Sequence, residues 1–220
     1  MGEVRLTYFA GWGLAEQTRW LLAATETEWT QVALQSNAEF ESLKSQGKLM
    51  FGQLPLLEID GLQLVQSQAM LRYVGRKGGL GGKTAAEEAT IDMVCEGVKD
   101  ARGPVVQYAF QQNQAAFARQ VPAQIARNLG CFEKLVASNG DAVVASGISI
   151  ADVLLAELMH ELSLICPSIT AHYPHLKALH DRIIALPGLQ AYLSSEKRYP
   201  LPEGEVASVY VANVGAVLGR

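Results

Sequence analysis

The chain has 220 residues, of which 49% are hydrophobic and 18% charged, and its formal net charge is −4 at pH 7. This composition excludes an intrinsically disordered chain, and the length suits one large domain or two small ones. The acidic balance and the lack of Lys/Arg runs argue against nucleic acid and anionic membrane as partners.

The apolar stretches and the cysteines indicate in which cellular compartment the protein resides. No apolar stretch reaches the roughly 18 residues that cross a bilayer, and the N-terminus lacks the apolar core of a signal peptide. The three cysteines, Cys95, Cys131 and Cys166, are widely spaced among apolar helical residues. This spacing favours reduced core thiols over disulfides. We therefore expect a cytoplasmic protein with no membrane contact.

The first third of the chain predicts strands and helices in the order βαβ, helix, ββα. Apolar side chains alternate from Val4 to Phe9, the period of a strand with one buried face, and Tyr8 lies near its end. The Asp60-Gly61 pair between two apolar runs is a strong hairpin signal. The other elements expected here are a helix over 14–25, a strand over 29–34, a helix over 38–45, hairpin strands over 56–59 and 62–65, and a helix that begins near residue 67.

The remainder of the chain predicts an all-helical part. Residues 78–83, Gly-Gly-Leu-Gly-Gly-Lys, interrupt the pattern, because glycine is costly inside a helix. Ser149 with Asp152 three residues later forms a capping-box pattern before an apolar run. The expected helices span residues 85–114, 121–139, 150–165, 173–186, 188–195 and 206–218. The order of elements predicts an α+β fold.

Two motifs suggest sites that their context argues against. Gly82-Lys83-Thr84 is similar to the end of a phosphate-binding P-loop, but Lys77 stands where that motif needs its first glycine. Histidines cluster at positions 172, 175 and 180 without a Cys or carboxylate at a recognisable ligand spacing. We therefore expect neither a nucleotide site nor a metal site.

The helix that begins near Ser67 has no carboxylate in its first turn. Helix N-termini present unpaired N–H groups and about half a positive charge, so they attract anions. With Ser67 as the expected N-cap, a ligand carboxylate could bind its hydroxyl and backbone N–H, and Gln66 could face the ligand's amino group. Alternatively, the helix simply lacks an acid, which is common.

The Leu54-Pro55 bond precedes a buried strand. In the cis form such a bond exposes the N–H and C=O of Leu54 as an edge for an extended peptide. In the trans form Pro55 would only begin the strand. The residues alone leave both readings open.

Three stretches together resemble the cytosolic glutathione transferases: LTYFAGWGLAEQTRWLLAA (residues 6–24), FGQLPLLEIDGLQLVQSQAMLRYVGRK (51–77) and SIADVLLAEL (149–158). The resemblance covers nearly the whole chain and is to the alpha, mu, pi and sigma group, with the alpha class nearest. It implies a thioredoxin-like glutathione-binding domain with a mixed four-stranded sheet and helices, a linker, and an all-helical domain that carries the hydrophobic-substrate site and a C-terminal helix. These parts would span residues 1–78, 79–84 and 85–220.

The resemblance implies that Tyr8 is the catalytic residue, whose hydroxyl donates to the glutathione sulfur. A thiol with a pKa of about 8.5 is only a few per cent ionised at pH 7, and a hydrogen bond to the thiolate favours ionisation. Read alone, Tyr8 is a core tyrosine with a satisfied hydroxyl. Arg19 matches a structural arginine of the family that pairs with nearby carboxylates.

Further glutathione contacts also follow from the resemblance. The Leu54 backbone would pair with the cysteinyl unit, and Gln53 with Lys44 or Lys48 would lie toward the glycyl carboxylate. Asp100 would reach across a dimer to the ligand's amino group. Read alone, these charges are solvated surface groups. The implied glutathione-binding residues are Tyr8, Lys44, Lys48, Gln53, Leu54, Pro55, Gln66, Ser67 and Asp100.

An apolar substrate site is implied between the two domains. The tail helix over 206–218 would border it, either as a mobile lid or as a helix docked permanently on the core. Leu14 stands where alpha-class members carry an arginine that polarises the thiolate, which weakens the alpha assignment but not the tyrosine mechanism. The residues expected to line this site are Phe9, Gly11, Trp12, Val106 and Phe110.

The function implied is conjugation of the glutathione thiolate to small hydrophobic electrophiles, and the resemblance also allows a glutathione peroxidase activity. Glutathione would be a co-substrate, no cofactor would be needed, and the protein would be a homodimer. Two alternatives stay open: a glutathione-dependent isomerase of sigma type, and a non-catalytic ligand-binding or structural member of the fold. The joint presence of Tyr8, Gln53, Gln66 and Ser67 favours the enzyme.

Overall fold

A four-stranded mixed sheet forms the centre of the N-terminal part of the computed structural model, which describes residues 2–220. Strand β1 (Arg5–Tyr8) lies between β2 (Thr30–Ala33), its parallel neighbour, and β3 (Leu56–Ile59), its antiparallel neighbour. The hairpin partner β4 (Leu62–Val65) completes the order β2-β1-β3-β4. The predicted mixed sheet and its Asp60-Gly61 hairpin are confirmed.

Side-chain alternation along the strands divides the sheet into two faces. Leu6, Tyr8 and Leu57 belong to the large core shared with the helical part of the chain. Leu56 belongs to a smaller core on the opposite face, which also contains Val217 from the last helix. Because Tyr8 shares the face of Leu6, its side chain points toward the junction of the two parts.

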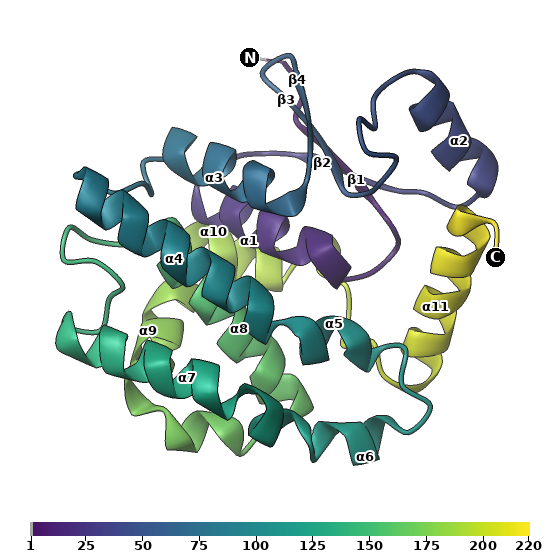
Figure 1. Ribbon diagram of the computed structural model, residues 1–220. Helices are drawn as coiled ribbons and strands as arrows, with labels where there is room; N and C mark the ends of the chain where they lie inside the picture. Colours follow the sequence, from purple (N-terminus) through teal and green to yellow (C-terminus); the bar gives the residue numbers. More distant parts are fainter. Residues whose placement is uncertain (1) are drawn as a thin grey trace.

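Three helices surround the sheet, and a short 3-10 turn, η1 (Gly13–Ala15), precedes the first of them. Helices α1 (Glu16–Ala24) and α3 (Ser67–Lys77) lie between the sheet and the helical part (Figure 1). Helix α2 (Asn37–Ser45) lies apart from them, near the C-terminus of the chain. The N-terminal elements therefore occur in the predicted order.

Helices make up the rest of the chain, and α8 is its central helix because it is buried on nearly all sides. The predicted capping box opens α8, since the Ser149 hydroxyl accepts from the Asp152 N–H and the Asp152 carboxylate accepts from the Ser149 N–H. No helix within residues 2–220 is both long enough and apolar enough to span a membrane. The bounds are α4 (Ala85–Ala101), α5 (Gly103–Tyr108), α6 (Gln114–Ala118), α7 (Val121–Ser138), α8 (Ile150–Ile165), η2 (Ile169–His172), α9 (Pro174–Ile184), α10 (Pro187–Leu193) and α11 (Gly204–Leu218).

The single helix expected over residues 85–114 is wrong. Helix α4 ends at Ala101, a short α5 follows, and α6 begins only at Gln114. Gly103 and Pro104 explain the break, since proline lacks the N–H that a continuing helix requires but fits a first turn well. The break places α5 beside the loop that follows β1 and so shapes the site.

The expectation of three core thiols is wrong for Cys131. Cys95 and Cys166 are buried, whereas Cys131 is exposed, and all are free thiols. The buried stripe of α7 passes through Leu129 and Phe132, which leaves position 131 on the outer surface of the helix.

A buried carboxylate, Glu16, joins the two parts of the chain at the start of α1. It accepts hydrogen bonds from Arg19 at 2.9 Å, from Tyr192 at 2.8 Å and from Arg198 at 2.8 Å. Burial alone would raise the pKa of Glu16, but Arg198 and Arg19 outweigh it and lower the pKa. The expected structural role of Arg19 is confirmed by this ion pair.

Replacing this carboxylate should destabilise the fold strongly. Glu16→Ala removes the carboxylate that pairs with the buried Arg19 and the nearly buried Arg198, so we expect the free energy of unfolding to fall by about 3 to 5 kcal/mol. Chemical denaturation measures this change. As a matched control, Asp181→Ala removes an exposed carboxylate paired with Lys177 and should cost at most about 1 kcal/mol. Equal losses in the two variants would contradict the role of Glu16.

Candidate active site

Tyr8 lies at the end of β1, and its side chain is 5% exposed. Its hydroxyl oxygen accepts a hydrogen bond from the Leu14 backbone N–H at 3.0 Å. Burial raises the pKa of Tyr8, although the hydrogen bond from Leu14, the nearby Tyr210 hydroxyl and the charges of Arg19 and Arg102 act in the opposite direction. The phenol therefore keeps its proton at neutral pH and is suited to donate a hydrogen bond to an anion.

Gly13 allows the loop to pass directly over this hydroxyl. Its φ is +49°, a conformation that favours glycine. A Cβ atom there would lie 2.5 Å from the Tyr8 hydroxyl oxygen and 2.8 Å from that of Tyr210. A larger residue would displace one hydroxyl or both.

The start of α3 differs from its expected form at one residue. Gln66, with φ of +68°, is the N-cap and Ser67 is the first helical residue, so the expectation that Ser67 caps the helix is wrong. The Gln66 carbonyl already accepts the N–H groups of Ala69 and Met70 at 3.0 and 3.2 Å. The Ser67 hydroxyl therefore makes no capping hydrogen bond to the helix.

Unpaired donors remain at this helix start. Within residues 2–220, neither the Ser67 hydroxyl nor the backbone N–H groups of Ser67 and Gln68 have a hydrogen-bond partner. The first turn contains no acid, and Arg76 and Lys77 lie in the last turn. The positive end of the helix dipole is therefore open to an anionic ligand.

The loop before β3 lies beside this helix start. The Leu54-Pro55 bond is cis, one of the two forms that the sequence left open. Among the described residues, no hydrogen bond involves the N–H or C=O of Leu54. Gln53 accepts a hydrogen bond from Gln66 at 3.4 Å, which brings the two predicted amide side chains together.

A cavity of about 200 Å³ connects the helix start with the helical part of the chain. Ser67 and Gln68 line its polar end, and Leu14 and Val106 supply apolar surface. The cavity thus joins the acid-free start of α3 to an apolar surface beside the loop that covers Tyr8.

Known proteins share this architecture. Residues 4–76 match the glutathione S-transferase N-terminal domain, and residues 99–196 match the C-terminal domain. The chain is 37% identical over 207 residues to glutathione S-transferase alpha-3 of Rattus norvegicus, covering 92% of this chain and 94% of the relative. The chain belongs to the glutathione S-transferase family. As a member of this family it is a transferase.

Two solved structures extend the comparison. A monomeric glutathione S-transferase from Necator americanus superposes with a TM-score of 0.78 at 28% identity, covering 90% of this chain and 98% of the other. Prostaglandin synthase D of Nilaparvata lugens superposes with a TM-score of 0.74 at 26% identity, covering 90% of this chain and 100% of the other.

The two candidate lysines of this transferase are both held by carboxylates. Lys48 bonds to Glu58 on β3 at 2.8 Å, and both side chains are half-buried. Lys44 bonds to the more exposed Glu41 at 2.7 Å. The Cε atom of Lys44 lies 3.9 Å from the position that a Cβ atom would take on Gly52, next to Gln53. Lys44 is therefore close to the candidate site, whereas Lys48 is fixed to the sheet.

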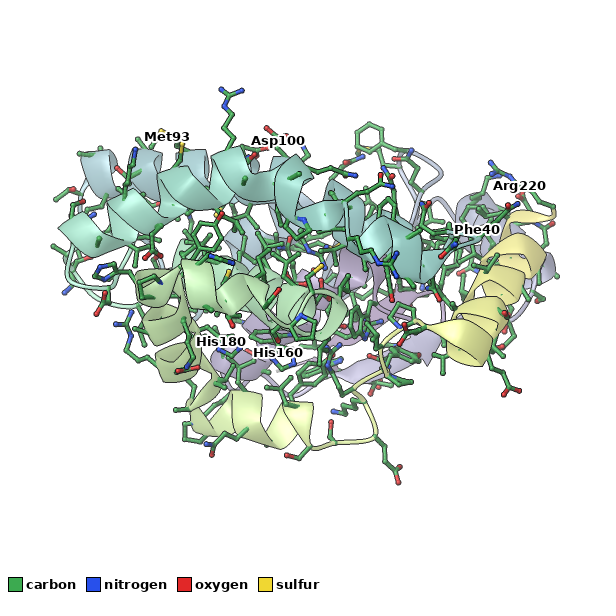
Figure 2. The ribbon with its side chains drawn as sticks, turned by 90° about the horizontal axis from the view of Figure 1, so that it is seen from below. Phe40, Met93, Asp100, His160, His180 and Arg220 are labelled. Atoms are coloured by element: carbon green, nitrogen blue, oxygen red, sulfur yellow. The ribbon has the colours of Figure 1, made fainter. Side chains whose placement is uncertain are left out.

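Asp100 lies in a different place from the Ser67 cavity. It is exposed near the end of α4, on the same helix as Met93 (Figure 2). Both residues line a groove of about 580 Å³ together with Cys131 and Phe132 of α7. Within one chain, Asp100 and Ser67 do not line a common cavity.

The apolar site expected from the sequence is largely filled by Tyr210 of α11. Its ring lies 2.4 Å from where a Cβ atom on Gly11 would stand and 5.8 Å, between centroids, from the ring of Phe110. Trp12 is buried and its Nε1 donates to the Tyr199 carbonyl, and Phe9 packs edge-on against Tyr8. Sequence reasoning named only the tail here, because nothing distinguishes Tyr210 from other apolar positions of that helix.

Three histidines of the C-terminal part contact one another or a carboxylate. His160 and His180 lie side by side, 3.3 Å apart between ring nitrogens (Figure 2). His175 bonds to Asp141 at 2.7 Å. Burial lowers the pKa of His160 to about 4, so its ring is neutral at pH 7. Residues 2–220 contain no group of three or more Asp, Glu, His or Cys side chains arranged to hold a metal ion.

Substitution at Gly13 should disable the site. In Gly13→Ala the added methyl would overlap the Tyr8 hydroxyl, so we expect glutathione-dependent turnover to fall on the order of 100-fold. Gly130→Ala, at a glycine with open space around it in α7, is the matched control and should retain parental turnover. Steady-state kinetics measures both, and full turnover in Gly13→Ala would contradict the crowding at Tyr8.

Proposed function

We propose that this transferase conjugates the thiolate of glutathione to small hydrophobic electrophiles, with Tyr8 as its catalytic residue. One observation carries the proposal: a buried, protonated Tyr8 hydroxyl lies next to a loop that borders the open helix start at Ser67. The first group suits a thiolate and the second suits a carboxylate. Glutathione carries both kinds of group.

The bound tripeptide would extend from α3 to α2. Its γ-glutamyl carboxylate would accept from the Ser67 hydroxyl and from free N–H groups of the first turn of α3. Gln66 would face its amino group, and the Leu54 backbone would pair with the cysteinyl unit beside Pro55. Family resemblance and the unpaired backbone groups of Leu54 support this placement.

The glycyl carboxylate would lie near Gln53 and Lys44. Lys44 can leave its exposed partner Glu41 at little cost, because exposed ion pairs contribute at most about 1 kcal/mol. Lys48 would have to break a half-buried pair with Glu58, so its contribution would be the smaller one.

Chemistry would begin with transfer of the thiol proton to solvent water. The Tyr8 O–H then donates to the sulfur, and lowering the thiol pKa by about two units requires nearly 3 kcal/mol of preferential stabilisation. The thiolate attacks an electrophilic carbon, a carbon–sulfur bond forms, and the leaving group departs with its electron pair. The electrophile would enter the apolar end of the cavity at Leu14 and Val106.

Tyr8→Phe should separate the enzyme from a mere binding protein. Loss of one charge-assisted hydrogen bond predicts a fall in kcat/KM of about 10- to 100-fold with a chlorodinitrobenzene substrate. Retention on immobilised glutathione should persist. The control is Tyr73→Phe, which loses a hydroxyl bonded to Asp60 on the surface and should keep parental kinetics. A parent that binds glutathione without turnover would favour the ligand-binding alternative.

A glutathione-dependent isomerase is the second candidate. The structural neighbour from Nilaparvata lugens carries the name prostaglandin synthase D, and it aligns over 90% of this chain. In an isomerase the thiolate adds and is later expelled, so free glutathione is not consumed. A peroxide substrate assayed with product analysis distinguishes isomerised product from a stable conjugate and from reduction to the alcohol.

We further propose that two copies of the chain form a homodimer. Met50 and Phe51, in the loop before β3, are 78% and 59% exposed. The groove between α4 and α7 offers a receptor of apolar Met93, Val94 and Phe132. Seating the loop of each copy in the groove of the other would carry Asp100 of the partner subunit toward the bound ligand.

Removing the apolar side chain should weaken this dimer. Phe51→Ala is expected to shift sedimentation at micromolar concentration toward the monomer, because buried aromatic anchors dominate such interfaces. Leu164→Ala, at an exposed leucine on α8, is the control and should leave the mass unchanged. A parent protein that already sediments as a monomer, like the Necator americanus relative, would overturn the proposal.

A further inference from the structure

The C-terminal helix brings a second phenol to the catalytic one. Tyr210 is buried on α11, and both its hydroxyl and that of Tyr8 lie within 3 Å of the Cβ position of Gly13. Residues 202 positions apart in the chain therefore place two hydroxyl groups together over the same turn. No signal in the sequence connects them.

Helix α11 is fixed to the N-terminal part at several points. The Asn213 side chain accepts from the Ala10 N–H at 2.9 Å and donates to the Leu34 carbonyl at 2.8 Å. Asn37 donates to the Val217 carbonyl at 3.0 Å. The end of the chain at Arg220 accordingly lies near α2 and its Phe40 (Figures 1 and 2). Tyr210 is thus held by a docked helix.

The hydrogen-bonding capacity of the Tyr8 oxygen is limited. A phenol has one proton to donate and two lone pairs that accept. One lone pair receives the Leu14 N–H at 3.0 Å. The Tyr210 hydroxyl lies within 3 Å of the same Cβ position on Gly13 as the Tyr8 hydroxyl, and it lowers the pKa of Tyr8, which is the direction expected when it donates to the second lone pair. A hydrogen bond from Tyr210 to the second lone pair leaves only the proton of Tyr8 available for another partner.

We propose that Tyr210 is a positioning residue for thiol ionisation: by donating to the Tyr8 oxygen, it leaves the Tyr8 proton free to bond to the sulfur. This inference rests on the proposed function. Tyr210 does not itself bond to sulfur. It fixes the direction in which Tyr8 donates and polarises the Tyr8 O–H, because hydrogen bonds in a chain strengthen one another.

The position of Tyr210 is compatible with a bound electrophile. Its ring lies between Gly11 and Phe110, and Tyr210 is not among the residues that line the cavity at Leu14 and Val106. The second phenol can therefore remain in place during the reaction. The uncharged Leu14 side chain cannot polarise the thiolate, and Leu14 contributes only its backbone N–H to the Tyr8 oxygen. In this proposal the Tyr210 hydroxyl supplies the additional polarisation of the Tyr8 O–H.

Tyr210→Phe tests the role of the hydroxyl, because it keeps the ring that packs against Gly11. We expect the pH midpoint of kcat/KM to rise by about 0.5 to 1 unit, with turnover below the midpoint about 3- to 10-fold lower. Tyr108→Phe is the matched control: its hydroxyl donates to Glu203 near the start of α11, and it should leave the pH midpoint unchanged.

A second readout does not depend on turnover. In protein containing isotope-labelled tyrosine, the Tyr8 resonance is assigned by its loss in Tyr8→Phe, and its titration midpoint should rise in Tyr210→Phe. An unchanged midpoint and pH profile in Tyr210→Phe, whether or not the melting temperature falls, would overturn the inference and leave Tyr210 a packing residue. The proposed function would fail separately, if Tyr8→Phe kept parental turnover.

Discussion

The hydrogen bond from the Leu14 N–H to the Tyr8 oxygen is the constraint around which the site is arranged. It requires the chain to turn back over the end of β1 within a few residues, which Gly13 permits. Catalysis by Tyr8 also needs a phenol that is buried enough to keep its proton at neutral pH but still accessible to a ligand. Burial at the junction of the two parts supplies the first condition, and the adjoining cavity supplies the second.

The elements beside this turn are held by charge and by packing. Glu16 follows the turn directly and collects Arg19 and Arg198 at the buried junction. Arg102 donates to the Gly13 carbonyl and pairs with Glu157 and Glu161 of α8. The loop over Tyr8 is therefore connected to helices of both parts, which explains how a short, glycine-rich segment keeps one geometry.

Local sequence patterns were sufficient for most of the fold. The alternation before Tyr8, the Asp60-Gly61 turn and the Ser149 capping pair each depend on neighbouring residues, and each was found where expected. Pro104 could have indicated the break after α4, because proline disfavours helix continuation, but the apolar period on both sides concealed it. The vacant start of α3 was visible in the sequence because charge complementarity at helix ends is also local.

The site was predictable only in part, since its remaining features depend on contacts between distant segments. The position of Tyr210 over Gly11 results from the docking of α11, and the sequence cannot specify that contact. The pairing of Lys48 with Glu58 depends on how the loop after α2 meets β3. Gln66, and not Ser67, is the N-cap because its backbone adopts a positive φ. The residue types at these two positions do not reveal that conformation.

Donation from Tyr8 should make the glutathione sulfur ionise more readily in this protein than in water. Ultraviolet difference titration of the thiolate in the complex of the unmodified protein with glutathione tests it directly. The bound thiol should have a pKa about two units below the value of about 8.5 for a free thiol. A bound thiol that ionises at its solution value would contradict it.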